Sequence, residues 1–74
     1  MKGMPLAMGE LLKKLRIEHG YTQEVLGDIL HVQHQRISAW EHEIYDVPLP
    51  ILVKLSELYG VSTDELLAPF KSTH

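Results

Sequence analysis

Hydrophobic residues recur every three or four positions along most of the chain, which is the spacing of an amphipathic helix. The pattern runs through residues 8–18, 22–29, 33–42, 49–59 and 62–67. The positions predicted to face a core are Met8, Leu11, Leu12, Leu15, Ile17, Val25, Leu26, Ile29, Val32, Ile37, Trp40, Leu49, Leu52, Val53, Leu55 and Leu58. No segment alternates with the period of two that is typical of a half-buried strand. The pattern therefore predicts an all-α fold of five short helices.

Residues that favour helix ends stand between these segments. Thr22 is suited to the N-cap of the second helix, because its hydroxyl can accept a hydrogen bond from a free backbone N–H. Gly20 and Gly60 follow the first and fourth segments, where glycine commonly ends a helix. Ser62 and Glu65 have the spacing of a capping box. The predicted helices thus begin and end at residues that can satisfy their termini.

The second and third segments are separated only by a corner over residues 30–32, and together they form a helix-turn-helix pattern. Gly27 lies inside the second helix, where glycine costs about 1 kcal/mol relative to alanine. We therefore expect another backbone to approach Gly27 closely, because two helices joined by so short a corner cross tightly.

Polar side chains gather on the third helix, away from the face of Ile37 and Trp40. They are amides, an imidazole, a guanidinium and small groups, contributed by Gln33, His34, Gln35, Arg36, Ser38 and Ala39. Amide and guanidinium groups can hydrogen-bond to base edges in the major groove of DNA. A solvated turn is the simpler interpretation of such a run, but its place on the second helix of a helix-turn-helix favours a face that reads DNA.

The charge balance affects the predicted strength of DNA binding, because phosphate contacts dominate affinity for nucleic acids. Lys and Arg number 7 against 10 Asp and Glu, which gives a formal charge of −3 at pH 7. The acidic residues collect over 41–46 and at Asp64 and Glu65, whereas the face of the third helix is near neutral or mildly positive. This distribution permits DNA binding and predicts a modest non-specific affinity.

Composition argues against several other classes of protein. At 74 residues the chain is expected to form one domain, and without cysteine it has neither a disulfide nor a thiolate metal site. We interpret His31, His34 and His42 as surface residues, so no metal or other cofactor is expected. No signal peptide or membrane-spanning segment is recognised, which predicts a cytoplasmic, nucleoid-associated protein without a membrane partner. No enzyme activity is expected, because paired carboxylates in an apolar setting and a glycine-rich phosphate loop are missing.

The order and spacing of the residues resemble the Cro/C1-type (XRE) helix-turn-helix family over about residues 8–67. The resemblance is carried by Leu15, Arg16, Gly20, Tyr21, Thr22, Gln23, Leu26, Val32, Ile37, Ser38, Trp40, Glu41, Leu49, Leu52, Lys54, Leu55, Gly60, Val61, Ser62, Asp64, Leu66 and Leu67. It implies a compact five-helix, lambda-repressor-like DNA-binding domain over residues 8–70. A flexible arm over residues 1–7 and a frayed tail over 71–74 would flank this domain.

The resemblance also implies roles for individual residues. Gln23, at the start of the second helix, would contact a phosphate. The base-reading residues in the major groove would be Gln33, His34, Gln35 and Ala39, of which Gln35 is suited to adenine. The residues at the DNA backbone or a flanking base would be Arg36, Ser38 and His42. Arg16 and Glu41 would form an internal ion pair that holds the reading helix against the first helix.

Four residues depart from the family's usual pattern. Gly27 stands where alanine is usual, and His31 stands where glycine is common, which places a side chain at a left-handed corner. His42 and Glu43 follow Glu41, where the family usually has a basic residue and a glycine. One phosphate contact is thereby lost and Glu43 adds repulsion, so weaker DNA binding is expected.

These patterns predict a sequence-specific regulator of transcription that binds double-stranded DNA, most simply a repressor on a palindromic operator. Two-fold operators need two copies with half-sites about 34 Å apart, so a homodimer is expected, formed through the C-terminal part of the chain. The alternative is an antitoxin-like protein-interaction module with weak DNA binding, whose main contact is a protein partner. Exposed apolar surface near Leu66, Leu67 and Phe70 would favour that alternative.

Overall fold

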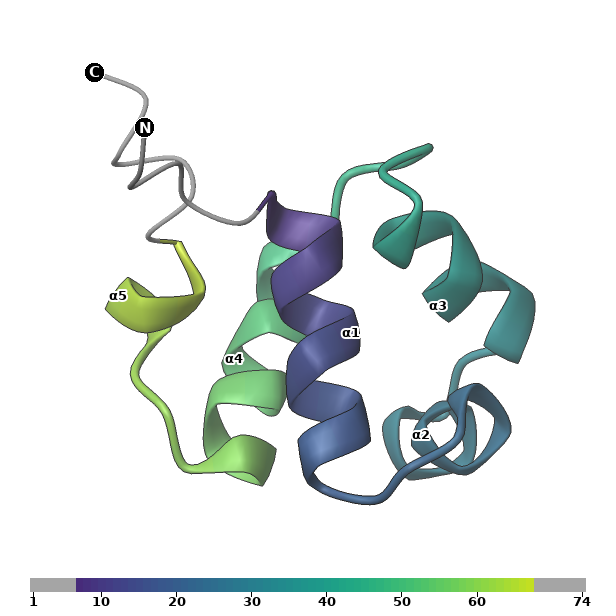
Figure 1. Cartoon of the computed structure of the whole chain (residues 1–74), viewed down its shortest axis with the longest axis horizontal. Coiled ribbons are helices and arrows are strands. Elements are labelled where there is room, and N and C mark those ends of the chain that lie inside the picture. Colours follow the sequence, from purple (N-terminus) through teal and green to yellow (C-terminus); the bar gives the residue numbers. More distant parts are fainter. Residues whose placement is uncertain (1–6, 68–74) are drawn as a thin grey trace.

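The computed structural model describes residues 7–67, and these form α-helices joined by short connectors, without a strand. Figure 1 shows the order of these helices, which are α1 (Met8–Glu18), α2 (Gln23–Leu30), α3 (His34–Glu41), α4 (Leu49–Tyr59) and α5 (Thr63–Leu66). The prediction of an all-α, five-helix fold is therefore confirmed. The tail predicted over residues 71–74, Phe70 and all of the predicted arm except Ala7 lie outside the described residues.

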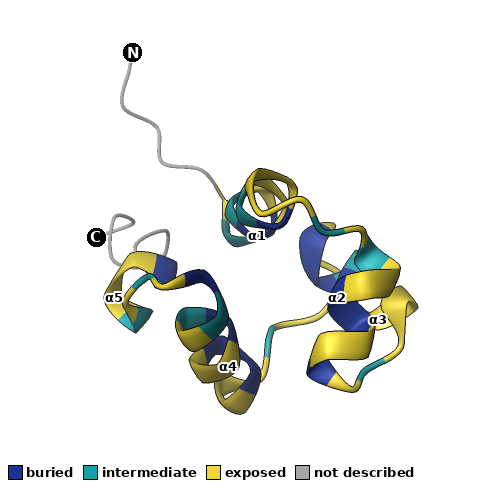
Figure 2. Cartoon of the chain, turned by 90° about the horizontal axis from the view of Figure 1, so that it is seen from below, coloured by how far each residue is buried: buried dark blue, intermediate teal, exposed yellow. Residues whose placement is uncertain are grey.

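α1 lies in the middle of the molecule, between the pair α2–α3 and the pair α4–α5 (Figure 1), and it packs on both α3 and α5. The buried faces of the helices turn toward one another in Figure 2. They form one core of Leu12, Leu26, Leu30, Ile37, Trp40, Ile51, Leu52, Leu55, Tyr59 and Leu66. Every helix contributes to this core, so the orientation of α3 depends on packing against the whole domain.

The core-facing side of α2 differs from the prediction. Val25 and Ile29, both predicted to face the core, are 45% and 41% exposed. Leu30, which the prediction assigned to the corner, is buried instead. α2 continues through Leu30 before the chain turns, so Leu26 and Leu30, one helical turn apart, form its buried stripe.

The apolar positions of α1 and α4 were also predicted only in part. In α1, Ile17 is exposed because the neighbouring Arg16 takes the position that faces the core. In α4, Leu49 and Val53 are exposed, and the residues buried in their place are Ile51 and Tyr59. Adjacent helix positions lie about 100° apart, so a small rotation of a helix exchanges which of two apolar neighbours is covered.

The predicted caps of α2, α4 and α5 are confirmed. The Thr22 hydroxyl accepts a hydrogen bond from the backbone N–H of Val25 at 3.0 Å. Ser62 and Glu65 make both hydrogen bonds of a capping box. Gly60 ends α4 with φ of +69°, a left-handed conformation that glycine adopts at little cost. These local contacts define the lengths of the helices on which the rest of the structure is built.

The corner between α2 and α3 brings two stretches of backbone into close contact. A Cβ atom at Gly27 would lie 2.6 Å from the carbonyl oxygen of Val32, so the predicted reason for glycine at this position is confirmed. His31 adopts a left-handed conformation, with φ of 61° and ψ of 41°, at the end of α2. The absence of a side chain at Gly27 and the turn at His31 together place the first turn of α3 close to α2.

Candidate nucleic-acid interface

The polar face predicted on the third helix is exposed in the structure. α3 spans His34–Glu41, so Gln33 and His42 flank it as its N-cap and C-cap residues rather than lying within it. The side chains of Gln33, His34, Gln35 and Arg36 are exposed, while Ile37 and Trp40 are buried on the opposite side of the helix. The burial of Trp40 confirms that it belongs to the core, and α3 therefore presents an unbroken polar surface at its first turn.

Open grooves border this surface, and two of them contain Gln35. One lies at the corner between α2 and α3 and is lined by Glu24, Gly27, Asp28, His31, Val32, Gln33, His34 and Gln35. The other lies between α3 and the connector to α4 and is lined by Gln33, Gln35, Arg36, Ala39, Trp40, Tyr45, Asp46 and Pro48. Gln33 and Gln35 thus contribute to both grooves, whereas Arg36 and Ala39 lie on the side of the connector.

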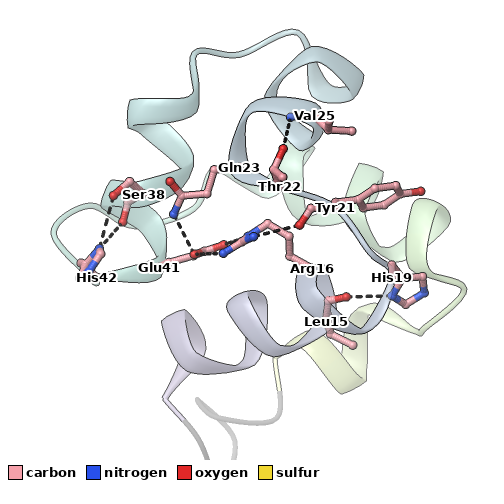
Figure 3. A network of polar contacts seen from close by, with 10 residues as sticks. All are labelled: Leu15, Arg16, His19, Tyr21, Thr22, Gln23, Val25, Ser38, Glu41 and His42. Carbon is pink, nitrogen blue, oxygen red and sulfur yellow. Dashed lines mark hydrogen bonds and ion pairs between the residues drawn. The ribbon is translucent and has the colours of Figure 1, made fainter.

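A buried ion pair joins α1 to the end of α3, as Figure 3 shows. Arg16 Nε donates to Glu41 Oε2 at 2.7 Å, and a terminal nitrogen of the same guanidinium donates to Glu41 Oε1 at 3.1 Å. The other terminal nitrogen donates to the carbonyl oxygen of Tyr21 at 2.9 Å. The hydrogen bond that Arg16 donates to Glu41 raises the pKa of Arg16 above its ordinary value. The planar, two-point contact therefore adds a directional constraint to the packing that positions α3 relative to α1.

Gln23 is part of the same network, which the sequence did not indicate. Its side-chain amide nitrogen donates to Glu41 Oε1 at 3.1 Å (Figure 3). Glu41 thus receives hydrogen bonds from α1 and from the first residue of α2. No spacing rule reveals such a contact, because Gln23 and Glu41 are 18 residues apart and meet only when the helices pack.

Ser38 and His42 lie against each other at the end of α3 (Figure 3). His42 Nδ1 is 2.9 Å from the carbonyl oxygen of Ser38 and 3.4 Å from its hydroxyl. A carbonyl oxygen only accepts hydrogen bonds, so Nδ1 carries the proton in this contact. With Nδ1 engaged in this contact, Nε2 is the ring nitrogen that remains for a ligand.

Glu43 has a structural contact where only repulsion was expected. Its backbone is left-handed, with φ of 60°, and its carboxylate accepts a hydrogen bond from the backbone N–H of Gly9 at 3.2 Å. The N-cap residue of α1, Ala7, makes no side-chain cap. Glu43 therefore supplies a carboxylate to the first turn of α1, where negative charge is favourable. A Cβ atom at Gly9 would collide with the carbonyl oxygen of Glu41, which explains the glycine there.

Across residues 7–67, no three His, Cys, Asp or Glu side chains cluster as ligands of a metal ion would. Within the same residues, no helix has the length and apolar character needed to cross a bilayer.

Comparison with known proteins agrees with this architecture. A family model described as helix-turn-helix matches residues 12–66, which include all of α2, α3 and α4. The chain belongs to the Cro/C1-type helix-turn-helix family. Members of this family are DNA-binding regulators of transcription.

Several curated relatives are similar to the chain. The transcriptional regulator ImmR of Bacillus subtilis (strain 168) is 39% identical over 62 residues, which are 84% of this chain and 49% of ImmR. An uncharacterized regulator of the same strain, YonR, derived from the SPbeta prophage, is 42% identical over 66 residues, which are 89% of this chain and 58% of YonR. A putative transcriptional regulatory protein of Thermococcus gammatolerans is 37% identical over 51 residues, 69% of this chain and 16% of that protein. The chain thus spans about half the length of its two Bacillus relatives.

Proposed function

We propose that this domain binds double-stranded DNA as the recognition module of a transcriptional regulator, with α3 in the major groove. One observation carries the proposal: α3 presents an exposed polar first turn, and its last residue is anchored to α1 by the buried Arg16–Glu41 pair. A helix that reads base edges must enter the groove in a constant orientation, and the ion pair with its hydrogen bond to Gln23 provides this constraint.

In this proposal the residues that read bases are Gln33, His34, Gln35 and Ala39. Gln35 is the strongest candidate, because its exposed amide can make paired hydrogen bonds to the N6 and N7 atoms of adenine. The residues proposed to contact the backbone are Gln23, Arg36, Ser38 and His42. Gln23 would contact a phosphate while its side-chain amide nitrogen keeps its hydrogen bond to Glu41. This hydrogen bond supports a second role for Gln23, which is to hold the end of α3 in position.

The proposal includes a homodimer on a palindromic operator, and repression through occlusion of a promoter. A single α3 contacts only a few base pairs, so two copies with recognition helices about 34 Å apart would supply the specificity that one lacks. Such a regulator would act in the cytoplasm, at the nucleoid. ImmR and YonR, both HTH-type transcriptional regulators by name, support regulation of transcription for this chain.

A second candidate function is protein interaction with weak DNA binding, in the manner of an antitoxin. The net charge of −3 favours it, and so does the apolar surface at Ile44, Tyr45 and Leu49, each at least 65% exposed. Large exposed apolar side chains that lie close together in a chain are typical of binding surfaces.

Selection from a pool of random duplexes, followed by fluorescence anisotropy at two salt concentrations, tests the proposal. We expect enrichment of one palindromic sequence, bound more tightly than the pool and more weakly at higher salt. Gln35→Ala should lose about 1–3 kcal/mol of discrimination at one base pair of each half-site. Glu57→Ala, an exposed change on α4, is the matched control and should retain the preference. No enrichment in the wild-type protein would reject the proposal in favour of protein interaction.

A further inference from the structure

We propose that a third groove, between the α2–α3 corner and the start of α4, binds a small aromatic carboxylate through Arg36, and that this ligand weakens DNA binding. The binding site rests on the groove alone, whereas its effect on DNA rests on the proposed function. The groove has a volume of about 490 Å³, within the range of about 300–1,000 Å³ that is usual for small-molecule sites. His34 and Gln35, which are proposed to read bases, do not line it.

The floor of this groove is apolar. Trp40 and Ile51, which are 3% and 9% exposed, line it together with the half-buried Val32 and with Pro48. An aromatic ring bound here would cover apolar surface of α3, of α4 and of the corner, and it could pack against the indole of Trp40. The backbone of DNA is charged along its whole length and is poorly suited to cover such a floor. The floor therefore favours a small apolar group.

The rim of the groove supplies a free cation. Arg36 lines the groove, and its guanidinium makes no hydrogen bond or ion pair with any other residue of 7–67. A guanidinium matches a carboxylate in a planar, two-point contact. Gln33 and His31 line the same groove, and the side-chain amide of Gln33 can donate a further hydrogen bond to the ligand.

The charge of this groove differs from that of its neighbours. The groove at the α2–α3 corner contains Glu24 and Asp28, and the one along the connector contains Asp46. No Asp or Glu is among the described residues that line the third groove. In a chain of net charge −3, a groove with an unpaired arginine and no carboxylate favours an anion. An aromatic ring that carries a carboxylate matches both the floor and the rim.

Such a ligand would compete with DNA for one side chain. Arg36 is proposed to contact the DNA backbone, and a carboxylate bound to its guanidinium would remove that contact. The two ligands would then weaken each other's binding by the same factor. We expect saturation of the groove to weaken binding of a duplex by about three- to tenfold, which corresponds to the loss of about one phosphate contact.

Two-dimensional NMR of the isotope-labelled full chain, titrated with sodium 1-naphthoate, tests the site without DNA. The chain contains one tryptophan, so the indole N–H signal of Trp40 is identified directly. We expect this signal to shift with a dissociation constant of about 1 mM, as is usual for a ligand of this size in an open site. The neutral analogue 1-naphthylmethanol should bind about tenfold more weakly.

Arg36→Gln should weaken naphthoate binding about tenfold and leave binding of naphthylmethanol unchanged, because only the charge contact is lost. Unchanged binding of the neutral analogue would also show that the groove is intact in this variant. Lys13→Gln removes the same charge from an exposed position on α1 and is the matched control. It should bind both compounds as the wild type does.

Anisotropy of a labelled duplex, with saturating naphthoate or an equal concentration of sodium acetate, tests the effect on DNA. Naphthoate should weaken binding by the wild type and by Lys13→Gln, and it should have no effect on Arg36→Gln.

The outcomes that overturn the inference are distinct. An unmoved Trp40 signal, or equal binding of naphthoate by wild type and Arg36→Gln, would reject the site and leave the proposed DNA binding intact. Naphthoate binding without any change in duplex affinity would reject the regulatory effect alone. If naphthoate binds and the wild type binds neither random nor selected duplex, the proposed function fails and the carboxylate site stands.

Discussion

Arg16 and Glu41 are 25 residues apart in the chain, yet their side chains meet in the core with 2.7 Å between Nε and Oε2. The arginine side chain is 10% exposed and the glutamate side chain 3%. Removal of either side chain would leave the other charge buried without its counter-charge, which is unfavourable for the folded state. The pair therefore couples the stability of the domain to the orientation of α3.

Removal of one partner should destabilise the domain strongly. We expect Glu41→Gln to lower the free energy of unfolding by about 3–5 kcal/mol, because the charge of Arg16 stays buried without compensation. Urea unfolding followed by circular dichroism measures this loss. Glu18→Gln is the control: Glu18 forms an exposed pair with Lys14 at 4.0 Å, and such surface pairs contribute at most about 1 kcal/mol. Equal losses in the two variants would show that burial gives the Arg16–Glu41 pair no special role.

Gly27→Ala should destabilise the domain although alanine is the better helix former. In an open helix the change would stabilise by about 1 kcal/mol. Here the new Cβ would lie 2.6 Å from the carbonyl oxygen of Val32, so we expect a net loss of about 1–3 kcal/mol as the corner moves. Chemical denaturation gives the value, with Asp28→Ala on the exposed side of α2 as the control. A more stable Gly27→Ala variant would mean that the corner adjusts without strain.

His31→Gly should stabilise the domain. His31 is exposed and left-handed, and a side chain in that conformation costs roughly 1 kcal/mol that glycine avoids. We expect the melting temperature to rise by about 4–8 °C, the usual shift per kcal/mol for a domain of this size. Glu43→Gly provides the contrast, because Glu43 has a similar φ of 60° but would lose its hydrogen bond to Gly9. Its gain should be smaller or reversed, and an equal gain in both variants would contradict the anchoring role of Glu43.

Stability should fall at alkaline pH because of Tyr59. Burial raises the pKa of Tyr59 from 10.0 to about 12. Above pH 10 the unfolded chain releases this proton while the folded chain retains it, so the free energy of unfolding decreases as pH rises from about 10 to about 12. The expected loss is of the order of 2–3 kcal/mol across that interval.

Thermal melts between pH 9 and pH 12 test this assignment. Tyr59→Phe should lose the alkaline decrease, whereas Tyr45→Phe, a change at an exposed tyrosine, should keep it. The Tyr59 hydroxyl is buried and has no hydrogen-bond partner among the described residues. Tyr59→Phe should therefore be no less stable than the wild type at pH 7. An alkaline decrease that persists in Tyr59→Phe would assign it to another group.

His42→Arg should strengthen DNA binding. The change places a permanent cation at the end of α3, where His42 Nδ1 lies against the carbonyl oxygen of Ser38. We expect about three- to tenfold tighter binding to a random duplex and a salt dependence steeper by about one phosphate contact. Glu57→Gln changes the net charge by the same amount on α4 and should have a smaller effect. Equal gains in both variants would show that net charge alone, and not position, sets the affinity.

Much of the candidate site followed from sequence. The polar run from Gln33 to Arg36 was predicted to be exposed and Trp40 to be buried, because the 3.6-residue period separates the two faces of a helix. The contacts of Gln23 with Glu41 and of Glu43 with Gly9 could not be predicted in this way. Each joins residues from different elements, and their side chains meet only after the helices have packed.

The sequence by itself determined which residues cap most of the helices and that the chain forms a helix-turn-helix. The reason is that caps such as Thr22, and a left-handed glycine such as Gly60, act within one or two turns of the backbone. Only the tertiary structure decided which apolar neighbours are covered, with Leu30 buried and Ile29 exposed. A helix offers more apolar positions than its neighbours can cover, so the choice depends on the arrangement of all the helices around the core.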